Sequence, residues 1–295
     1  MTTSTALRPS VRAALYALID YAGLFPPAQL SVTAAQAEYA SARAGPHAWM
    51  LGRFIVPAAV LDGWSGIEAP FSVILDGEEE LQGLSAIRER NRSVAAIEVP
   101  PKLWAQGETF AEAIGALRRG LAGARAGLDV FVEVPSAAYS PQSLAQTMPA
   151  VARAGFCAKL RCGGPTGDAF PSVEEVADFI HAASRAGVPF KATAGLHHPV
   201  RHLDAASGFT MHGFLNLLAA AALASRVDAP TLQRIVAEED ASAFRFDDDS
   251  FAWRDERVGV EELTQTRLSV FVAYGSCSFS EPIDDLSALG ILSAR

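Results

Sequence analysis

A regular alternation of short apolar segments with amphipathic helical segments constrains the fold of this chain more than any other feature. The apolar segments are rich in β-branched and aromatic residues, and most end in Gly or Pro, as strands do. They are RFIVPA from Arg53, FSVILDG from Phe71, VAAIEVP from Val94, DVFVEVP from Asp129, FCAKLRCGG from Phe156, PFKATAG from Pro189, GFLNLL from Gly213 and AFRFD from Ala243. Strands that alternate with helices form a parallel sheet, and eight such units close into a barrel. We therefore predict an α/β fold, a (β/α)8 TIM-type barrel.

We expect one domain over residues 1–295, because half of the residues are hydrophobic and no linker divides the chain. Residues 1–50 are predicted to form a helical N-terminal cap, with one helix over Val11 to Ile19 and a second from about Ser31. Residues from about 244 to 295 are predicted to hold the last strand and the C-terminal helices. FRFDDDSFAWRDERVGV is equally compatible with a hairpin outside the barrel.

Charge and apolar patterning argue against several classes of partner. The formal net charge is −9, and the scattered lysines and arginines form no basic stripe for nucleic acid. The N-terminal segment lacks a signal-peptide core, and the longest apolar run, from Phe214 to Ala224, is too short to span a bilayer. The three cysteines form no CxxC pair, which argues against a disulfide framework. We expect a cytoplasmic protein that acts on a small molecule, with no nucleic-acid or membrane partner, and homo-oligomer formation stays open.

Ionisable side chains recur near the carboxyl ends of the middle strands, where barrels of this type build their active sites. They are Glu98, Glu133, Lys159, Arg161 and Lys191. A period of two places Lys159 and Arg161 on one face of their strand, which we expect to point into the barrel. Two neighbouring cations lower one another's pKa, so Lys159 beside Lys191 is a candidate nucleophile. Glu98 and Glu133 either move protons or only neutralise the lysines in a structural ion network.

The segment from residue 157 to about residue 196 resembles class I aldolases of the deoxyribose-phosphate aldolase type. Two lysines end consecutive barrel strands there, and small residues follow each of them: Gly163 and Gly164 after the first, Ala192, Thr193 and Gly195 after the second. The resemblance implies that Lys159 forms the Schiff base and that Lys191 tunes it. After Lys191 this chain continues into Leu196-His197-His198-Pro199 instead of a glycine-rich phosphate-binding turn, and Glu98 stands where a catalytic aspartate is expected.

Four histidines suggest a different chemistry, since imidazole is a common ligand of zinc. A site for a divalent metal such as zinc would combine His197 or His198 with His202 or His212 and a carboxylate such as Glu133. Alternatively, these histidines bind substrate oxyanions or close a loop by hydrogen bonds, and His198 is then a substrate-binding candidate. Asn216, in the apolar run from Gly213, is expected to face the barrel interior and to bind a ligand or to serve the structure.

These residues lead to three hypotheses. The first is a cofactor-free lyase or isomerase that acts on a small carbonyl or carboxylate substrate. Its catalytic residues are Lys159, Lys191, Glu98 and Glu133, and its substrate-binding residues are Arg161, Asn216 and His198. The second is a metal-dependent hydrolase or isomerase that uses the His197/His198 loop. The third is a non-catalytic barrel that binds a small ligand.

Overall fold

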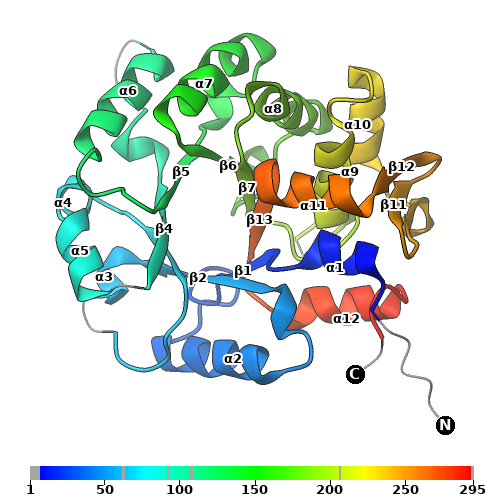
Figure 1. Cartoon of the computed structure of the whole chain (residues 1–295), viewed down its shortest axis with the longest axis horizontal. Helices are drawn as coiled ribbons and strands as arrows, with labels where there is room; N and C mark the ends of the chain where they lie inside the picture. The colour runs from blue at the N-terminus through cyan, green and yellow to red at the C-terminus, as the bar shows by residue number, and fades with distance from the viewer. Residues whose placement is uncertain (1–6, 62–63, 92, 106–108, 206, 294–295) are drawn as a thin grey trace.

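Eight parallel strands close into a barrel at the centre of the computed structural model (Figure 1). The structure describes residues 7–61, 64–91, 93–105, 109–205 and 207–293. Around the barrel the strands follow the order β1, β13, β7, β6, β5, β4, β3, β2. Their bounds are β1 Ile19–Tyr21, β2 Leu51–Pro57, β3 Phe71–Ile74, β4 Val94–Val99, β5 Asp129–Glu133, β6 Cys157–Arg161, β7 Phe190–Thr193 and β13 Phe271–Ser276. The predicted TIM-type barrel is confirmed.

Helices cover the outside of the barrel and connect its strands (Figure 1). They are α1 Pro9–Leu15, α2 Val32–Ala44, α3 Ala58–Leu61, α4 Glu78–Gln82, α5 Leu84–Arg90, α6 Phe110–Gly120, α7 Pro141–Ala154, α8 Val173–Ala186, α9 Phe214–Leu223, α10 Ala229–Ala237, α11 Val260–Ser269 and α12 Ser280–Ala288. Short 3₁₀ turns are η1 Ala48–Met50, η2 Pro101–Leu103, η3 Ser136–Ala138, η4 Gly167–Ala169 and η5 Ala241–Ala243. Helix α8 shows how local sequence sets these bounds: Ser172 and Glu175 form a capping box at its start, and left-handed Gly187 ends it.

The first and last strands of the barrel differ from the prediction. Residues 1–50 do not form a purely helical cap, because β1 lies in the barrel between β2 and β13. The apolar run from Gly213, predicted as a strand, is helix α9, and all ten of its residues are buried. A helix that is apolar on every side has no periodicity that separates it from a buried strand. The eighth strand is β13, which pairs with β1 and β7.

The predicted strand from Ala243 lies outside the barrel. It contributes β10 Phe244–Phe246, which forms an antiparallel sheet with β11 Ser250–Trp253 and β12 Glu256–Gly259. The alternative interpretation of this region as a hairpin is therefore correct. The sheet lies at the periphery of the molecule, beside α1 and α11 (Figure 1). A second hairpin, β8 His202–Leu203 and β9 Thr210–Met211, follows β7.

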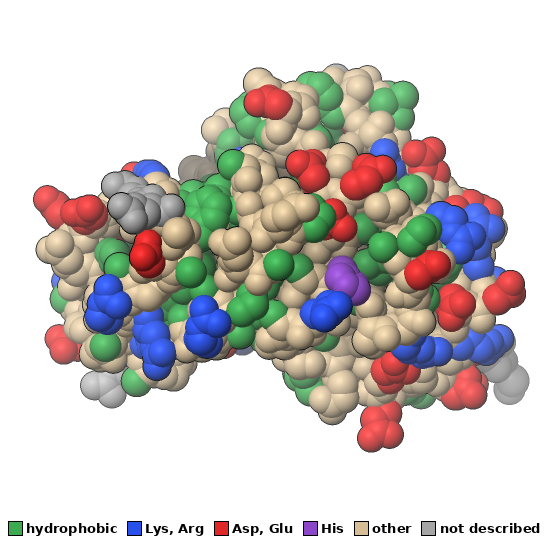
Figure 2. Space-filling model, turned by 90° about the horizontal axis from the view of Figure 1, so that it is seen from above, with side chains coloured by type: hydrophobic (Ala, Val, Ile, Leu, Met, Phe, Trp, Pro, Cys, Tyr) green, Lys and Arg blue, Asp and Glu red, His purple; other side chains and the backbone are tan. Residues whose placement is uncertain are grey.

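The surface on the side of α6, α7, α8 and α10 carries acidic, basic and hydrophobic side chains interspersed with one another (Figure 2). The apolar core lies between the strands and the surrounding helices, and it includes Phe54, Phe179, Phe190 and Leu217. Within the described ranges, no helix combines the length and apolar character needed to cross a membrane. The inside of the barrel, in contrast, is rich in charged groups.

Candidate active site

Acidic and basic side chains alternate in one chain of ion pairs through the barrel. Among the described residues this ion chain has eight members, in the order Asp129, Arg53, Asp20, Lys191, Glu98, Lys159, Glu133 and Arg161. It begins at Asp129, the first residue of β5, and ends at Arg161, the last residue of β6. The ion chain therefore runs from the amino ends of the strands to their carboxyl ends, where active sites of such barrels lie.

Lys191 is the most enclosed member of the ion chain. Its Nζ lies 2.6 Å from Asp20 Oδ2 and 2.7 Å from Glu98 Oε1, and its side chain is fully buried. The ammonium group also lies 5.2 Å from the centre of the Phe131 ring. Ser72 Oγ donates a hydrogen bond of 2.7 Å to Glu98 Oε1. Lys191 is thus held by three neighbours in a place that solvent does not reach.

Lys159 lies one step nearer to the carboxyl end of the barrel. Its Nζ is 2.8 Å from Glu98 Oε2 and 2.9 Å from Glu133 Oε2. Burial alone lowers the pKa of Lys159, but the two carboxylates outweigh burial and raise it above its usual value. The prediction that the lysines lower each other's pKa is therefore wrong for Lys159, because Glu98 lies between the two ammonium groups.

The contacts with the lysines shift the pKa of Glu98 in the opposite direction. Burial alone raises the pKa of Glu98, but Lys159 and Lys191 outweigh it and hold the pKa well below the usual carboxyl value. Glu98 therefore stays ionised at neutral pH and holds both lysines in place.

Exposure to solvent increases along the ion chain toward the carboxyl end. The exposed fraction of the side chain is 7% for Lys159, 13% for Glu133 and 46% for Arg161. Arg161 NH1 lies 3.8 Å from Glu133 Oε1. Solvent therefore reaches Arg161 more freely than Glu133, and Glu133 more freely than Lys159.

Close contact between two backbone segments shapes this end of the barrel. Gly195, after β7, has φ +68°, and a Cβ added to it would lie 3.1 Å from the carbonyl oxygen of Cys162, after β6. A Cβ added to Gly163 would lie 3.3 Å from the Cα of Gly195. Glycine at both positions lets the two segments pack directly against each other.

Two of the predicted histidines connect the loop after β7 to helix α12. His197 Nδ1 lies 3.2 Å from Glu281 Oε2, and His198 Nδ1 lies 2.5 Å from Asp285 Oδ2. Burial lowers the pKa of His197, although Glu281 opposes this effect. These contacts support the loop-closing interpretation of the histidines.

The structure does not bring together the predicted metal ligands. His202 Nδ1 lies 3.1 Å from the carbonyl oxygen of Val200, and His212 Nε2 lies 2.8 Å from that of Pro171. Glu133 contacts Lys159 instead of a histidine. In the part of the chain that the structure describes, no three His, Cys, Asp or Glu side chains are placed to share one metal ion.

Asn216 does not face the barrel interior as predicted, because it lies on α9 outside the strands. Its Nδ2 donates to the carbonyl oxygens of Ile235 at 2.9 Å and Glu238 at 2.8 Å, and its Oδ1 accepts from the backbone N–H of Arg201 at 2.9 Å. These bonds tie α9 to the end of α10 and to the loop after β7.

The predicted site lacked Asp20, Arg53 and Asp129, three members of the ion chain, and Ser72, which donates to Glu98. Asp20 lies on a strand of three residues, too short to show alternation. Ser72 and Arg53 lie on predicted strands, and the period-two argument used for Lys159 would have turned both inward.

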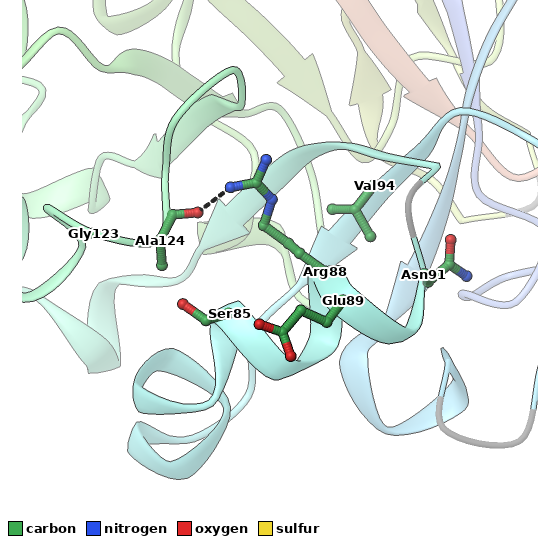
Figure 3. Close-up of a pocket in the computed structure, with 7 residues that line it drawn as sticks. All are labelled: Ser85, Arg88, Glu89, Asn91, Val94, Gly123 and Ala124. Atoms are coloured by element: carbon green, nitrogen blue, oxygen red, sulfur yellow. Dashed lines mark hydrogen bonds between the residues drawn. The ribbon is translucent and has the colours of Figure 1, made fainter.

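A surface pocket of about 460 Å³ lies away from the ion chain (Figure 3). Its lining comes from α5, the start of β4 and the segment after α6, and includes Arg88 and Val94. Arg88 donates to the carbonyl oxygen of Ala124 at 2.5 Å and to that of Ala126 at 2.8 Å, which fixes the segment that leads into β5. The pocket is thus at the amino ends of the strands, a location associated with stability in such barrels.

Comparison with known proteins gives matches at the level of structure only. No protein-family model and no curated protein matches this chain. A tetrameric deoxyribose phosphate aldolase from Aeropyrum pernix is 16% identical, with a TM-score of 0.47 over 65% of this chain and 80% of its own. A protein described as QR15, an aldolase, is 13% identical, with a TM-score of 0.45 over 63% of this chain and 83% of its own.

Proposed function

We propose that the protein is a class I aldolase-like lyase or isomerase in which Lys159 forms a Schiff base with a small carbonyl substrate. One observation carries this proposal: the Lys159 ammonium group lies between a buried carboxylate, Glu98, and a partly exposed one, Glu133. A lysine with a proton acceptor in contact, near the carboxyl ends of the barrel strands, has the parts that imine formation requires.

The proton of Lys159 has to leave before the amine can react. Glu98 is a poor acceptor, because the two lysines hold its pKa low. Glu133 Oε2, 2.9 Å from Nζ, is the acceptor in this proposal. Lys191 acts from a distance, because its charge keeps Glu98 ionised and Glu98 keeps the Lys159 side chain in position.

The neutral amine then adds to the carbonyl carbon, so that a C–N bond forms and the carbonyl oxygen takes the proton from Glu133. The nitrogen returns a proton to Glu133, which delivers it to the hydroxyl group as that group leaves as water. Together, one ammonium and one carbonyl group give one iminium ion and one water, and Glu133 is again a carboxylate. The iminium ion withdraws electrons from the adjacent carbon, which favours either cleavage of a C–C bond or loss of a proton there.

Borohydride trapping tests the proposal, and the sequence makes the test simple. The chain contains three lysines, Lys102, Lys159 and Lys191. Lys102 pairs with Asp76 at the surface and serves as an internal control for non-specific reductive alkylation. Peptide mass spectrometry after reduction with small aldehydes and oxo acids should find the adduct on Lys159 and none in Lys159→Met. Equal modification of Lys102 and Lys159, or none at Lys159, would remove the proposal.

A second candidate, a non-catalytic barrel that binds a small ligand, is favoured by the raised pKa of Lys159 and by the pairing of each member of the ion chain. On this view the charges serve the structure alone. It predicts that Lys159 is never trapped and that Lys159→Met lowers stability as a broken buried ion pair does, by about 3–5 kcal/mol. Trapping thus separates the two candidates.

A further inference from the structure

The two ends of the ion chain are built differently. At the amino ends of the strands, the Arg53 guanidinium is hydrogen-bonded to the Asp129 carboxylate, and the backbone N–H of Arg53 donates to Asp20 Oδ1 at 2.8 Å. At the carboxyl end, the Arg161 guanidinium has no hydrogen bond to another described residue. Its ion-pair partner, Glu133 Oε1, lies 3.8 Å away, beyond hydrogen-bond distance. The ion chain therefore ends in a hydrogen-bonded ion pair at Asp129 and, among the described residues, in a guanidinium without a hydrogen bond at Arg161.

Local packing holds Arg161 at the carboxyl end of β6, where 46% of its side chain is exposed to solvent. Its backbone N–H donates to the hydroxyl group of Tyr139 at 3.2 Å, which fixes the end of β6. A Cβ added to Gly164 would lie 3.5 Å from Arg161 NH2, so the guanidinium lies against the turn that follows β6. A guanidinium carries five N–H donors in a planar fork, a shape that matches a carboxylate with two parallel hydrogen bonds.

Lys159 and Arg161 are also close enough to act on one small molecule. They lie two residues apart on the same face of β6, and both contact the carboxylate of Glu133, Lys159 at Oε2 and Arg161 at Oε1. The space between the two cations is therefore spanned by a single carboxylate group. A substrate with its carbonyl carbon at Lys159 Nζ and an anionic group one or two atoms away would reach Arg161.

We propose that the substrate is a short oxo acid whose carboxylate is bound by the Arg161 fork, in place of the distant contact with Glu133. This inference rests on the proposed function and adds the substrate class. A guanidinium edge forms two parallel hydrogen bonds to a carboxylate or to a phosphate, so the measurements below compare the two anions.

The first measurement compares carbonyl compounds that differ in charge, and pyruvate and its methyl ester form the pair of similar size. Borohydride trapping on Lys159 is followed with increasing concentrations of pyruvate, its neutral methyl ester, acetone and dihydroxyacetone phosphate. For the wild type, half-maximal trapping by pyruvate is expected at a concentration about 10- to 100-fold lower than by methyl pyruvate, as for a charge-assisted hydrogen bond. Arg161→Gln should remove this preference. Arg226→Gln is the matched control, because Arg226 is similarly exposed and pairs with one carboxylate, Glu262, at 3.1 Å.

A second measurement does not depend on Schiff-base formation. Lactate has the carboxylate of pyruvate but no carbonyl group, and lactamide is its neutral counterpart. Calorimetric titration of the wild type should show binding of lactate and not of lactamide, with loss of lactate binding in Arg161→Gln.

The outcomes separate the two proposals. Equal trapping of pyruvate and methyl pyruvate, with no effect of Arg161→Gln, would overturn the oxo-acid assignment and leave the Schiff base standing. Arg161-dependent lactate binding without any adduct on Lys159 would remove the Schiff base and keep the carboxylate site. Preferred trapping of dihydroxyacetone phosphate that depends on Arg161 would overturn the carboxylate in favour of a phosphate.

Discussion

Lys159 and Lys191 are direct neighbours on β6 and β7, and the carboxylate of Glu98 contacts both ammonium groups. Removal of that carboxylate would leave two buried cations side by side. Glu98→Gln is therefore expected to lower the free energy of unfolding by about 3–5 kcal/mol, the usual cost of breaking a buried ion pair. Urea unfolding measures this loss. The matched control is Glu262→Gln, which breaks an exposed pair and should cost at most about 1 kcal/mol. Equal losses of unfolding free energy in the two variants would show that the buried contacts of Glu98 stabilise the fold no more than an exposed ion pair does.

Glu98 also gives stability a defined dependence on acid. Its pKa in the folded protein lies below the usual value, while in the unfolded chain it is about 4.3. The stability that ionised Glu98 contributes is thus fully present above about pH 4.3 and is lost as the pH falls toward the lower folded-state pKa. Urea midpoints measured from pH 7 to acid should fall more steeply in the wild type than in Glu98→Gln. Parallel curves would mean that Glu98 titrates alike in both states.

Lys191 is expected to support the fold and to take no part in covalent chemistry. Lys191→Met leaves Asp20 without its close cation and should cost about 3–5 kcal/mol. The double variant Lys191→Met/Asp20→Asn should cost less than the sum of the single changes, with a coupling of about 1–3 kcal/mol. Urea unfolding of the four proteins completes the cycle. Additive losses would show that the 2.6 Å contact carries no net energy.

Gly195 and Gly187 form a matched pair for the contact between β6 and β7. Both have left-handed backbone, with φ +68° and φ +63°, but a Cβ at Gly187 meets nothing within 4 Å, whereas one at Gly195 meets the Cys162 carbonyl oxygen at 3.1 Å. Gly187→Ala should cost about 1 kcal/mol from backbone strain alone. Gly195→Ala should cost about 1–3 kcal/mol more, because the two segments have to separate. Thermal or urea unfolding compares them, and equal costs would argue against tight packing at this end of the barrel.

Asn216 is expected to affect stability and not substrate affinity. Asn216→Ala removes donors from the carbonyl oxygens of Ile235 and Glu238 and an acceptor from the N–H of Arg201. Leaving such buried groups unpaired costs about 1–3 kcal/mol each, although relaxation reduces the total. The variant should unfold at a lower urea concentration than the wild type. The concentration of carbonyl compound that gives half-maximal trapping on Lys159 should be unchanged. A selective change in trapping would restore Asn216 as a ligand-binding residue.

The middle of the barrel could be predicted from the sequence, whereas its closure could not. Strands β3 to β7 lie within the predicted apolar runs, and β2 overlaps its run from Arg53 onward. These runs are short and rich in β-branched or aromatic residues, which is the pattern of a buried strand. The alternation of side chains along a strand also predicts that Lys159 and Arg161 lie on the same face, and the structure places both in the ion chain.

The barrel is closed by β1 and β13, whose sequences indicate strands less clearly than those of the middle strands. β1 has three residues, and the strongest apolar run near the C-terminal half proved to be the buried helix α9. The sequence also predicts the wrong direction for the pKa shift of Lys159. That direction depends on where the carboxylates of Glu98 and Glu133 point, which is decided by the closed barrel and not by the order of the strands.

Because β1 pairs with both β2 and β13, the barrel stays open during synthesis until residue 276 has left the ribosome. Asp20 meets Lys191 across a separation of 171 residues, so its carboxylate stays in water while most of the chain is made. At ordinary rates of translation the wait from β1 to β13 is on the order of ten to fifty seconds. Glu98 and the two lysines are all present before β13 appears, so the nascent protein holds most of the ion chain in an unclosed sheet. The contact between Asp20 and Lys191 therefore forms only after the last strand has been added.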